Sequence, residues 1–165
     1  MRKLLALDQS SRTTGWAVFN DKDLIKYGHF TINDDDVGVR LQQIRGKIQN
    51  LIDEYEINEI AFEDIQLQGT NNVKVFKILA EVFGVIYELA TELQIPNTAI
   101  LASTWRSGLK LNDASKRSSQ KQHAKDYIFK TYSIKPTEDE CDAICIGAYM
   151  TGKPAAASKD VFNWE

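Results

Sequence analysis

The sequence predicts an α/β domain built on a five-stranded mixed sheet, with three antiparallel N-terminal strands, two parallel strands and helices on both faces. Short apolar runs and alternating stretches, typical of strands, come first and then take turns with longer segments whose apolar residues recur at helical spacing. A helix between two strands returns the chain to a parallel neighbour, so the predicted order of three strands, helix, strand, helix, strand, helix and helix needs a mixed sheet. The chain has 165 residues, 43% of them hydrophobic and 26% charged, which suits one globular domain.

Three strands are predicted to open the chain. Residues 3–8 form an apolar run that ends at Asp8, residues 14–20 follow a short polar turn, and residues 24–31 alternate in polarity. A turn signal at 20–23 joins the second strand to the third. These short connections predict an antiparallel meander.

An amphipathic helix and another strand are predicted next. Three acids at 34–36 offer caps for a helix over 37–55, where apolar residues recur four and three positions apart and form one buried stripe. Residues 58–63 then favour a strand that ends in Glu63, and a polar loop follows over 66–72.

The segment 73–93 is predicted to be a helix that is apolar on two sides. Its two seams consist of Val75, Ile78, Val82, Val85 and Leu89, and of Phe76, Leu79, Phe83, Tyr87 and Ala90. Such a helix needs two partners, of which one is the sheet and the other is either a second subunit or another helix of the same chain. We favour a homodimer through this helix because closed twofold dimers are the commonest oligomers.

The C-terminal part is predicted to contain one more strand and two helices. The strand covers 97–101, a basic helix covers 116–132, and the last helix covers 137–151 and begins with a capping-box pattern. The predicted domain therefore extends over 1–152, and residues 153–165, with a proline and an alanine run, are expected to be a loosely held tail.

Composition excludes several classes of protein. No apolar run approaches the roughly 18–20 residues of a membrane span, and polar and charged residues interrupt the first ten positions, so neither a membrane span nor a secretory signal is predicted. Cys141 and Cys145 lie four residues apart in a predicted helix, where two small buried side chains are the simpler explanation than a disulfide. We expect a cytoplasmic protein.

The net charge of −3 hides a basic stretch over 103–130, which contains seven bases and two acids. A basic face on an acidic protein can attract phosphates while an acidic pocket collects cations, although a solvated helix face is the simpler alternative. Trp105 could stack on DNA or fill the core, and the polar loop residues could contact phosphates or only water. The candidate DNA contacts are Arg12, Gln66, Gln68, Asn71, Asn72, Trp105, Arg106, Lys110, Lys116, Arg117 and Lys121.

Four carboxylates occupy positions from which they can converge. Asp8 and Glu63 end apolar strands, whereas Asp139 and Asp142 lie three apart on one helix face, with about 5–6 Å between Cβ atoms. Acids gathered in one cleft repel one another, and Mg²⁺ relieves that repulsion. Two such ions about 3.5–4 Å apart can activate a water and stabilise the leaving oxygen of a phosphodiester. The layout predicts a site for two Mg²⁺ ions, with Mn²⁺ as a substitute; isolated surface acids and helix caps are the alternative.

The same residues carry a resemblance to a known family. The segment Leu-Ala-Leu-Asp8-Gln-Ser-Ser-Arg-Thr-Thr-Gly15-Trp-Ala-Val resembles the first strand pair of RuvC-like Holliday junction resolvases, within the ribonuclease H-like superfamily. Ile-Ala-Phe-Glu63 is similar to the second acidic strand of that family, and Asp139-Glu-Cys-Asp142 is similar to the start of its closing helix. The resemblance spans nearly the whole chain and is nearest to the phage-encoded branch, which would place the protein in the host cytoplasm.

This resemblance implies a metal-dependent endodeoxyribonuclease with a ribonuclease H-like fold. Such an enzyme is a homodimer, joined through the helix after the Glu strand, that resolves four-way junctions by paired nicks and leaves 5′-phosphate and 3′-hydroxyl ends. The residues carried over as catalytic metal ligands are Asp8, Glu63, Asp139 and Asp142. A lysine of the basic helix assists at the active site in cellular members, and Lys121, or less closely Lys116, falls near that position.

One departure from the cellular pattern bears on specificity. Cellular members place an aromatic residue shortly after the Glu. Here residues 64–69 contain no aromatic residue, and the next one along the chain is Phe76. We therefore expect a broader preference for branched DNA that includes forks and flaps.

Two other functions compete with the nuclease. A sugar-kinase-like or chaperone-like ATPase shares the apolar strand, Asp and following Gly, but that fold needs a second phosphate-binding hairpin and many more than 165 residues. A catalytically silent dimeric DNA-architectural protein of the same fold would need none of the four acids. The endonuclease remains the favoured prediction.

Overall fold

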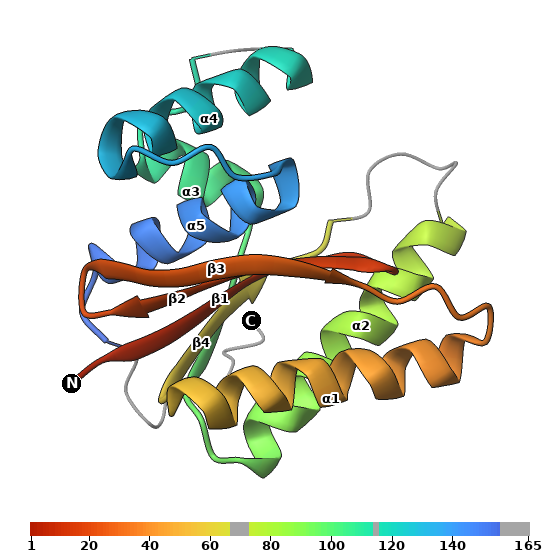
Figure 1. Ribbon diagram of the computed structural model, residues 1–165. Coiled ribbons are helices and arrows are strands. Elements are labelled where there is room, and N and C mark those ends of the chain that lie inside the picture. Colours follow the sequence, from red (N-terminus) through yellow and green to blue (C-terminus); the bar gives the residue numbers. More distant parts are fainter. Residues whose placement is uncertain (67–72, 114–115, 156–165) are drawn as a thin grey trace.

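The computed structural model describes residues 1–66, 73–113 and 116–155, and contains one mixed sheet with helices on both faces (Figure 1). The strands are β1 (Lys3–Gln9), β2 (Thr13–Asn20), β3 (Asp23–Thr31), β4 (Glu59–Glu63) and β5 (Asn97–Ile100). The helices are α1 (Val37–Tyr55), α2 (Val73–Glu92), α3 (Ala102–Gly108), α4 (Arg117–Tyr132) and α5 (Glu138–Thr151). The strand order is β3-β2-β1-β4-β5; β1, β2 and β3 pair antiparallel, whereas β4 pairs in parallel with β1 and β5. The predicted sheet is confirmed.

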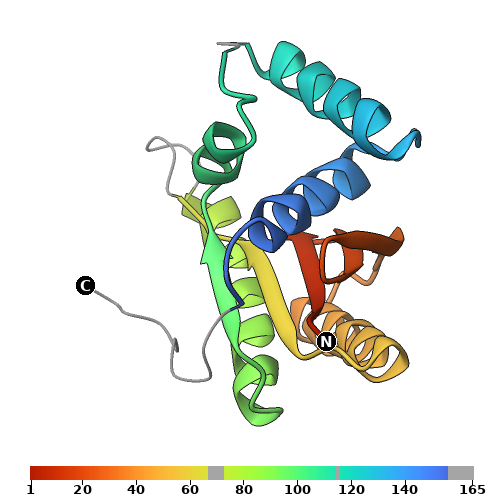
Figure 2. The same cartoon turned by 90° about the vertical axis from the view of Figure 1, so that its left-hand side faces the viewer.

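The sheet separates two hydrophobic cores. Helices α1 and α2 cover one face, whereas α5 lies on the other face with α3 and α4 outside it (Figures 1 and 2). Side chains alternate along β1, so Leu4 and Ala6 enter the core under α5 while Leu5 and Leu7 enter the core under α1 and α2. Because Asp8 continues the alternation of Leu4 and Ala6, it belongs to the face that α5 covers.

Helix α3 is an element that the sequence pattern did not predict. It has only seven residues, no side chain caps its N-terminus, and Trp105 is its one buried residue. Trp105 is completely buried in the core on the α5 side of the sheet, and the Arg106 guanidinium lies 4.7 Å from the centre of its ring. The sequence left open whether Trp105 stacks on DNA or fills the core. The structure buries it in the core, where its ring cannot stack on DNA.

Contacts within the chain cover only part of the apolar surface of helix α2. Its C-terminal half packs on α1 and the sheet, with Val82 1% exposed and Leu89 fully buried. Near its N-terminus, Val73 is 62% and Val75 is 53% exposed. The seam residue Val82 is therefore a core residue, whereas Val73 and Val75 leave apolar surface exposed at the start of α2.

The C-terminal end of α5 is tied to the N-terminus of the chain. The Arg2 guanidinium donates to the carbonyl oxygens of Met150, at 3.1 Å, and Lys153, at 2.6 Å, and it also pairs with the buried Glu59 carboxylate. Most of the predicted tail, residues 156–165, lies outside the described residues. Among the helices in the described ranges, none combines the length and the apolar character needed to cross a bilayer.

Candidate active site

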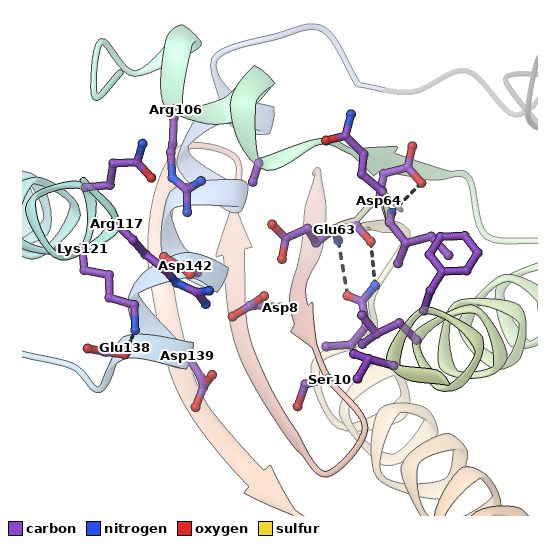
Figure 3. A pocket seen from close by; sticks show the side chains of 18 residues that line it. Asp8, Ser10, Glu63, Asp64, Arg106, Arg117, Lys121, Glu138, Asp139 and Asp142 are labelled. Atoms are coloured by element: carbon purple, nitrogen blue, oxygen red, sulfur yellow. Dashed lines mark hydrogen bonds and ion pairs between the residues drawn. The ribbon is translucent and has the colours of Figure 1, made fainter. Parts of the chain in front are cut away.

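The four predicted acids line one cleft of about 670 Å³ (Figure 3). Asp8 lies near the end of β1 and Glu63 ends β4, and the carboxyl ends of these parallel strands meet at the same edge of the sheet. Asp139 and Asp142 lie in the first two turns of α5, which packs across β1 and β2. The predicted convergence of these acids is confirmed.

A glycine allows α5 to approach the sheet at this point. Gly15 pairs with Asp8 across β1 and β2, and a Cβ atom on Gly15 would overlap the backbone carbonyl of Asp139. A side chain at this position would therefore separate the start of α5 from Asp8. The absence of a side chain at Gly15 thus lets α5 lie close to β2, which brings Asp139 and Asp142 near Asp8.

The start of α5 is fixed by the predicted capping box. The Thr137 hydroxyl accepts from the Glu140 amide at 3.4 Å, and the Glu140 carboxylate accepts from the Thr137 amide at 2.8 Å. The same carboxylate lies 2.8 Å from Nδ1 of His29 on β3. The Glu140 side chain is therefore used to cap α5 and to contact His29, whereas Asp139 and Asp142 point into the cleft (Figure 3).

The cleft destabilises its own negative charges. Burial raises the pKa of Asp8 well above its ordinary value, and a hydrogen bond and repulsion from Glu63, followed by the charges of Asp142 and Asp139, raise it further. Burial and then repulsion from Glu63 raise the pKa of Asp142 to about 6, although the nearby Arg106 acts in the opposite direction. A cation bound between these groups would remove the repulsion.

The donor set fits a hard divalent cation. Figure 3 shows Asp8 at the centre, with Glu63 on one side of it and Asp142 and Asp139 on the other. Carboxylate oxygens are the ligands that Mg²⁺ and Mn²⁺ prefer. Within the described ranges, no three His, Cys, Asp or Glu side chains stand close enough together to form a ready-made metal-binding group. The four acids line the same cleft.

Basic side chains from α3 and α4 form one wall of the cleft. Arg106, Arg117 and Lys121 line it beside Asp142 and Glu138 (Figure 3). The Lys121 ammonium pairs with the Glu138 carboxylate, which lowers the pKa of Glu138, and Lys125 lies 3.8 Å from the same carboxylate. The structure thus places Lys121 in the same cleft as the four predicted acids.

The other predicted contacts divide into three groups. Lys110 and Lys116 do not line the cleft, and Arg12 also lies outside it, donating to the Asp34 carbonyl at 3.2 Å and pairing with Asp35 at 3.4 Å. Gln66 lines the cleft. The predictions for Gln68, Asn71 and Asn72 fall outside the described residues.

Sequence reasoning missed several residues of the cleft. Gln9, Ser10 and Asp64 follow the strand acids directly and line the cleft with them, so their adjacency in sequence was an available signal. Val75, Phe76 and Leu79 also line it, because α2 begins beside the end of β4. Phe76 thus supplies an aromatic side chain to the cleft, although residues 64–66 carry none.

Comparison with known proteins identifies the family. The sequence model of the family described as crossover junction endodeoxyribonuclease RuvC matches residues 4–149. A RuvC crossover junction endodeoxyribonuclease from Shewanella piezotolerans is 26% identical over 163 residues, which cover 95% of this chain and 92% of the relative. Nucleases of this family are in general divalent-metal dependent.

Two solved structures show that the fold is ribonuclease H-like. Thermus thermophilus RuvC, solved in complex with a Holliday junction substrate, has a TM-score of 0.70 at 12% identity, with 90% of this chain and 92% of that chain covered. The Fowlpox virus resolvase, solved with substrate Holliday junction DNA, has a TM-score of 0.56 at 12% identity, with 91% of this chain and 97% of that chain covered. With its fold, its converging acids and a family match over most of its length, the chain belongs to the RuvC family of crossover junction endodeoxyribonucleases.

Proposed function

We propose that the protein is a metal-dependent endonuclease that resolves Holliday junctions, and other branched DNA such as forks and flaps, by paired nicks. Endodeoxyribonuclease activity follows from membership of the family. The observation that carries the rest is one cleft that contains the four predicted acids, two further acids and three bases. A catalytically silent DNA-architectural protein is not favoured, because such a protein gains nothing from acids whose burial and repulsion raise their pKa values.

In this proposal the acids hold divalent cations and the bases hold DNA. Two Mg²⁺ ions per site, with Mn²⁺ as a substitute, would bind at Asp8, Glu63, Asp139 and Asp142. When bound, the metal supplies an activated water and stabilises the leaving oxygen.

The basic wall then orients the strand to be cut. Arg106 and Arg117 would bind phosphates beside the scissile one, since a guanidinium donates two parallel hydrogen bonds to a phosphate. Lys121 lies in the same wall and would assist at the reacting phosphate as a point charge.

Branched DNA is proposed as the substrate because of the two walls of the cleft and because of the relatives. The Thermus and Fowlpox proteins were each solved with Holliday junction DNA. In addition to the bases, Ile65, Phe76 and Leu79 provide apolar surface in the same cleft. Unpaired bases at a branch point can contact such a surface, whereas the stacked bases of a continuous duplex cannot.

Paired nicks require two active sites, and we propose that a homodimer supplies them. The exposed Val73 and Val75 at the start of α2 support an interface there, next to the cleft wall formed by Phe76 and Leu79. We also propose that the enzyme acts in the cytoplasm, which is the host cytoplasm if a phage encodes it.

The test is cleavage of a labelled synthetic four-way junction, with Mg²⁺, Mn²⁺ or a chelator present. Asp8→Asn should slow cutting by at least roughly 10²-fold while junction binding is kept, because the substitution removes a metal ligand and little volume. Asp53→Asn, which changes an exposed carboxylate on α1 outside the cleft, is the matched control and should cut normally. Unchanged cutting by Asp8→Asn, or by wild type in the chelator, would refute the proposed metal site.

A further inference from the structure

The sheet divides at the level of the active-site acids. Parallel pairing of β1 with β4 ends at Leu7 and Phe62. On the outer sides the pairing continues, since β2 still pairs with β1 at Gln9 and β5 still pairs with β4 at Glu63. Asp8 and Glu63 therefore stand on two strands that no longer pair with each other.

The side chain of Gln9 bridges this division. Its carboxamide Nε2 donates to the backbone carbonyl oxygen of Glu63 at 2.6 Å, and its Oε1 accepts from the Glu63 amide at 3.3 Å (Figure 3). Gln9 is only 7% exposed, so the bridge lies in surroundings where water competes weakly. The carboxamide thus replaces the ladder hydrogen bonds that the separating strands have lost.

We infer that Gln9 is a positioning residue that sets the separation of the Asp8 and Glu63 carboxylates and thereby the affinity of the site for divalent cations. The backbone of Gln9 directly follows Asp8, and its side chain grips the backbone of Glu63, so the two acids are joined through one short linkage. When both carboxylates are ionised they repel each other, and the Gln9 bridge then limits how far their strands can separate. This inference rests on the proposed metal site.

The decisive variant is Gln9→Met, which keeps the length and volume of the side chain and removes both hydrogen bonds. Metal binding is measured without DNA, by titration of Mn²⁺ followed by electron paramagnetic resonance and by the rise of Tm with Mg²⁺. We expect affinity about 10-fold or more below wild type, as for other groups that orient metal ligands. In cleavage assays the half-saturating Mg²⁺ concentration should rise by a similar factor, and excess Mg²⁺ should restore most of the rate.

Asn97→Leu is the matched control. Asn97 is 5% exposed, and its Nδ2 donates to the Ile95 carbonyl at 3.3 Å near the start of β5, away from the cleft. This variant also loses a buried side-chain hydrogen bond, and its Mn²⁺ affinity should stay at the wild-type value whatever its change in Tm. A role of Gln9 in stability alone predicts the same behaviour for Gln9→Met.

Wild-type Mn²⁺ affinity in folded Gln9→Met would overturn the inference. If Gln9→Met does not fold, Gln9→Asn, which is one methylene too short to make both bonds, replaces it with the same expectation and the same refuting result. Asp8→Asn separates this inference from the proposed function. Loss of Mn²⁺ binding in Asp8→Asn but not in the Gln9 variant refutes only the role of Gln9, whereas wild-type protein that binds no Mn²⁺ refutes the metal site itself.

Discussion

Replacing Asp142 by Asn should stabilise the metal-free protein at neutral and alkaline pH. Burial and the charge of Glu63 raise the pKa of Asp142 from the ordinary 3.8 to about 6 in the folded state. The folded protein therefore binds the proton more tightly than the unfolded chain does. The corresponding contribution to stability is complete below pH 3.8 and is lost as the pH rises through 6. The asparagine of the variant carries no charge at any pH and escapes this loss.

The expected size follows from the same pKa values. A rise from 3.8 to about 6 corresponds to a free energy of about 3 kcal/mol at pH 8. For a domain of this length, that free energy shifts Tm by roughly 6–12 °C. At pH 4 most of the difference should vanish, because Asp142 of the wild type is then protonated in the folded protein.

The assay is thermal unfolding of wild type and Asp142→Asn in chelator at pH 4 and pH 8, with Asp53→Asn as a control for loss of an exposed carboxylate. Addition of Mg²⁺ at pH 8 should raise the Tm of wild type more than that of Asp142→Asn, because the ion neutralises the same repulsion. A variant that is less stable than wild type at pH 8 in chelator, or equally shifted at both pH values, would refute the reasoning.

Three further substitutions test other parts of the site. Gly15→Ala should destabilise by roughly 1–3 kcal/mol and abolish junction cleavage, because its Cβ would overlap the Asp139 carbonyl; wild-type cleavage would contradict the role given to this approach. Lys121→Met should slow single-turnover cleavage more than it weakens junction binding, since this ammonium lies in the cleft at Glu138; equal losses would reduce it to a phosphate contact. Val75→Glu should yield monomers in light scattering without lowering Tm, because this side chain is 53% exposed; a persistent dimer would exclude the start of α2 from the interface.

The sequence predicted the parts of the site that depend on local pattern. Apolar strands that end in Asp8 and Glu63 must meet at one edge if they are parallel, and that inference needs no coordinates. The role of Gly15 depends on how closely α5 lies on β2, which no local pattern encodes. An apolar seam does not reveal which neighbour covers it, so the sequence could not show that Val82 is buried within its own chain. Helix α3 was missed because one buried residue, Trp105, leaves no helical periodicity.

The acids and the bases of the cleft lie on different layers of the fold. The acids stand on central strands and on α5, which rests directly on the sheet, whereas Lys121 and Arg117 belong to α4, which packs on α5 in an outer layer (Figure 2). Small shifts of α4 would carry its cations with it and leave the carboxylate geometry intact. If the proposed function is right, this arrangement would let the DNA contacts of α4 adjust to branches of different shape while the carboxylates keep their positions on the sheet and α5.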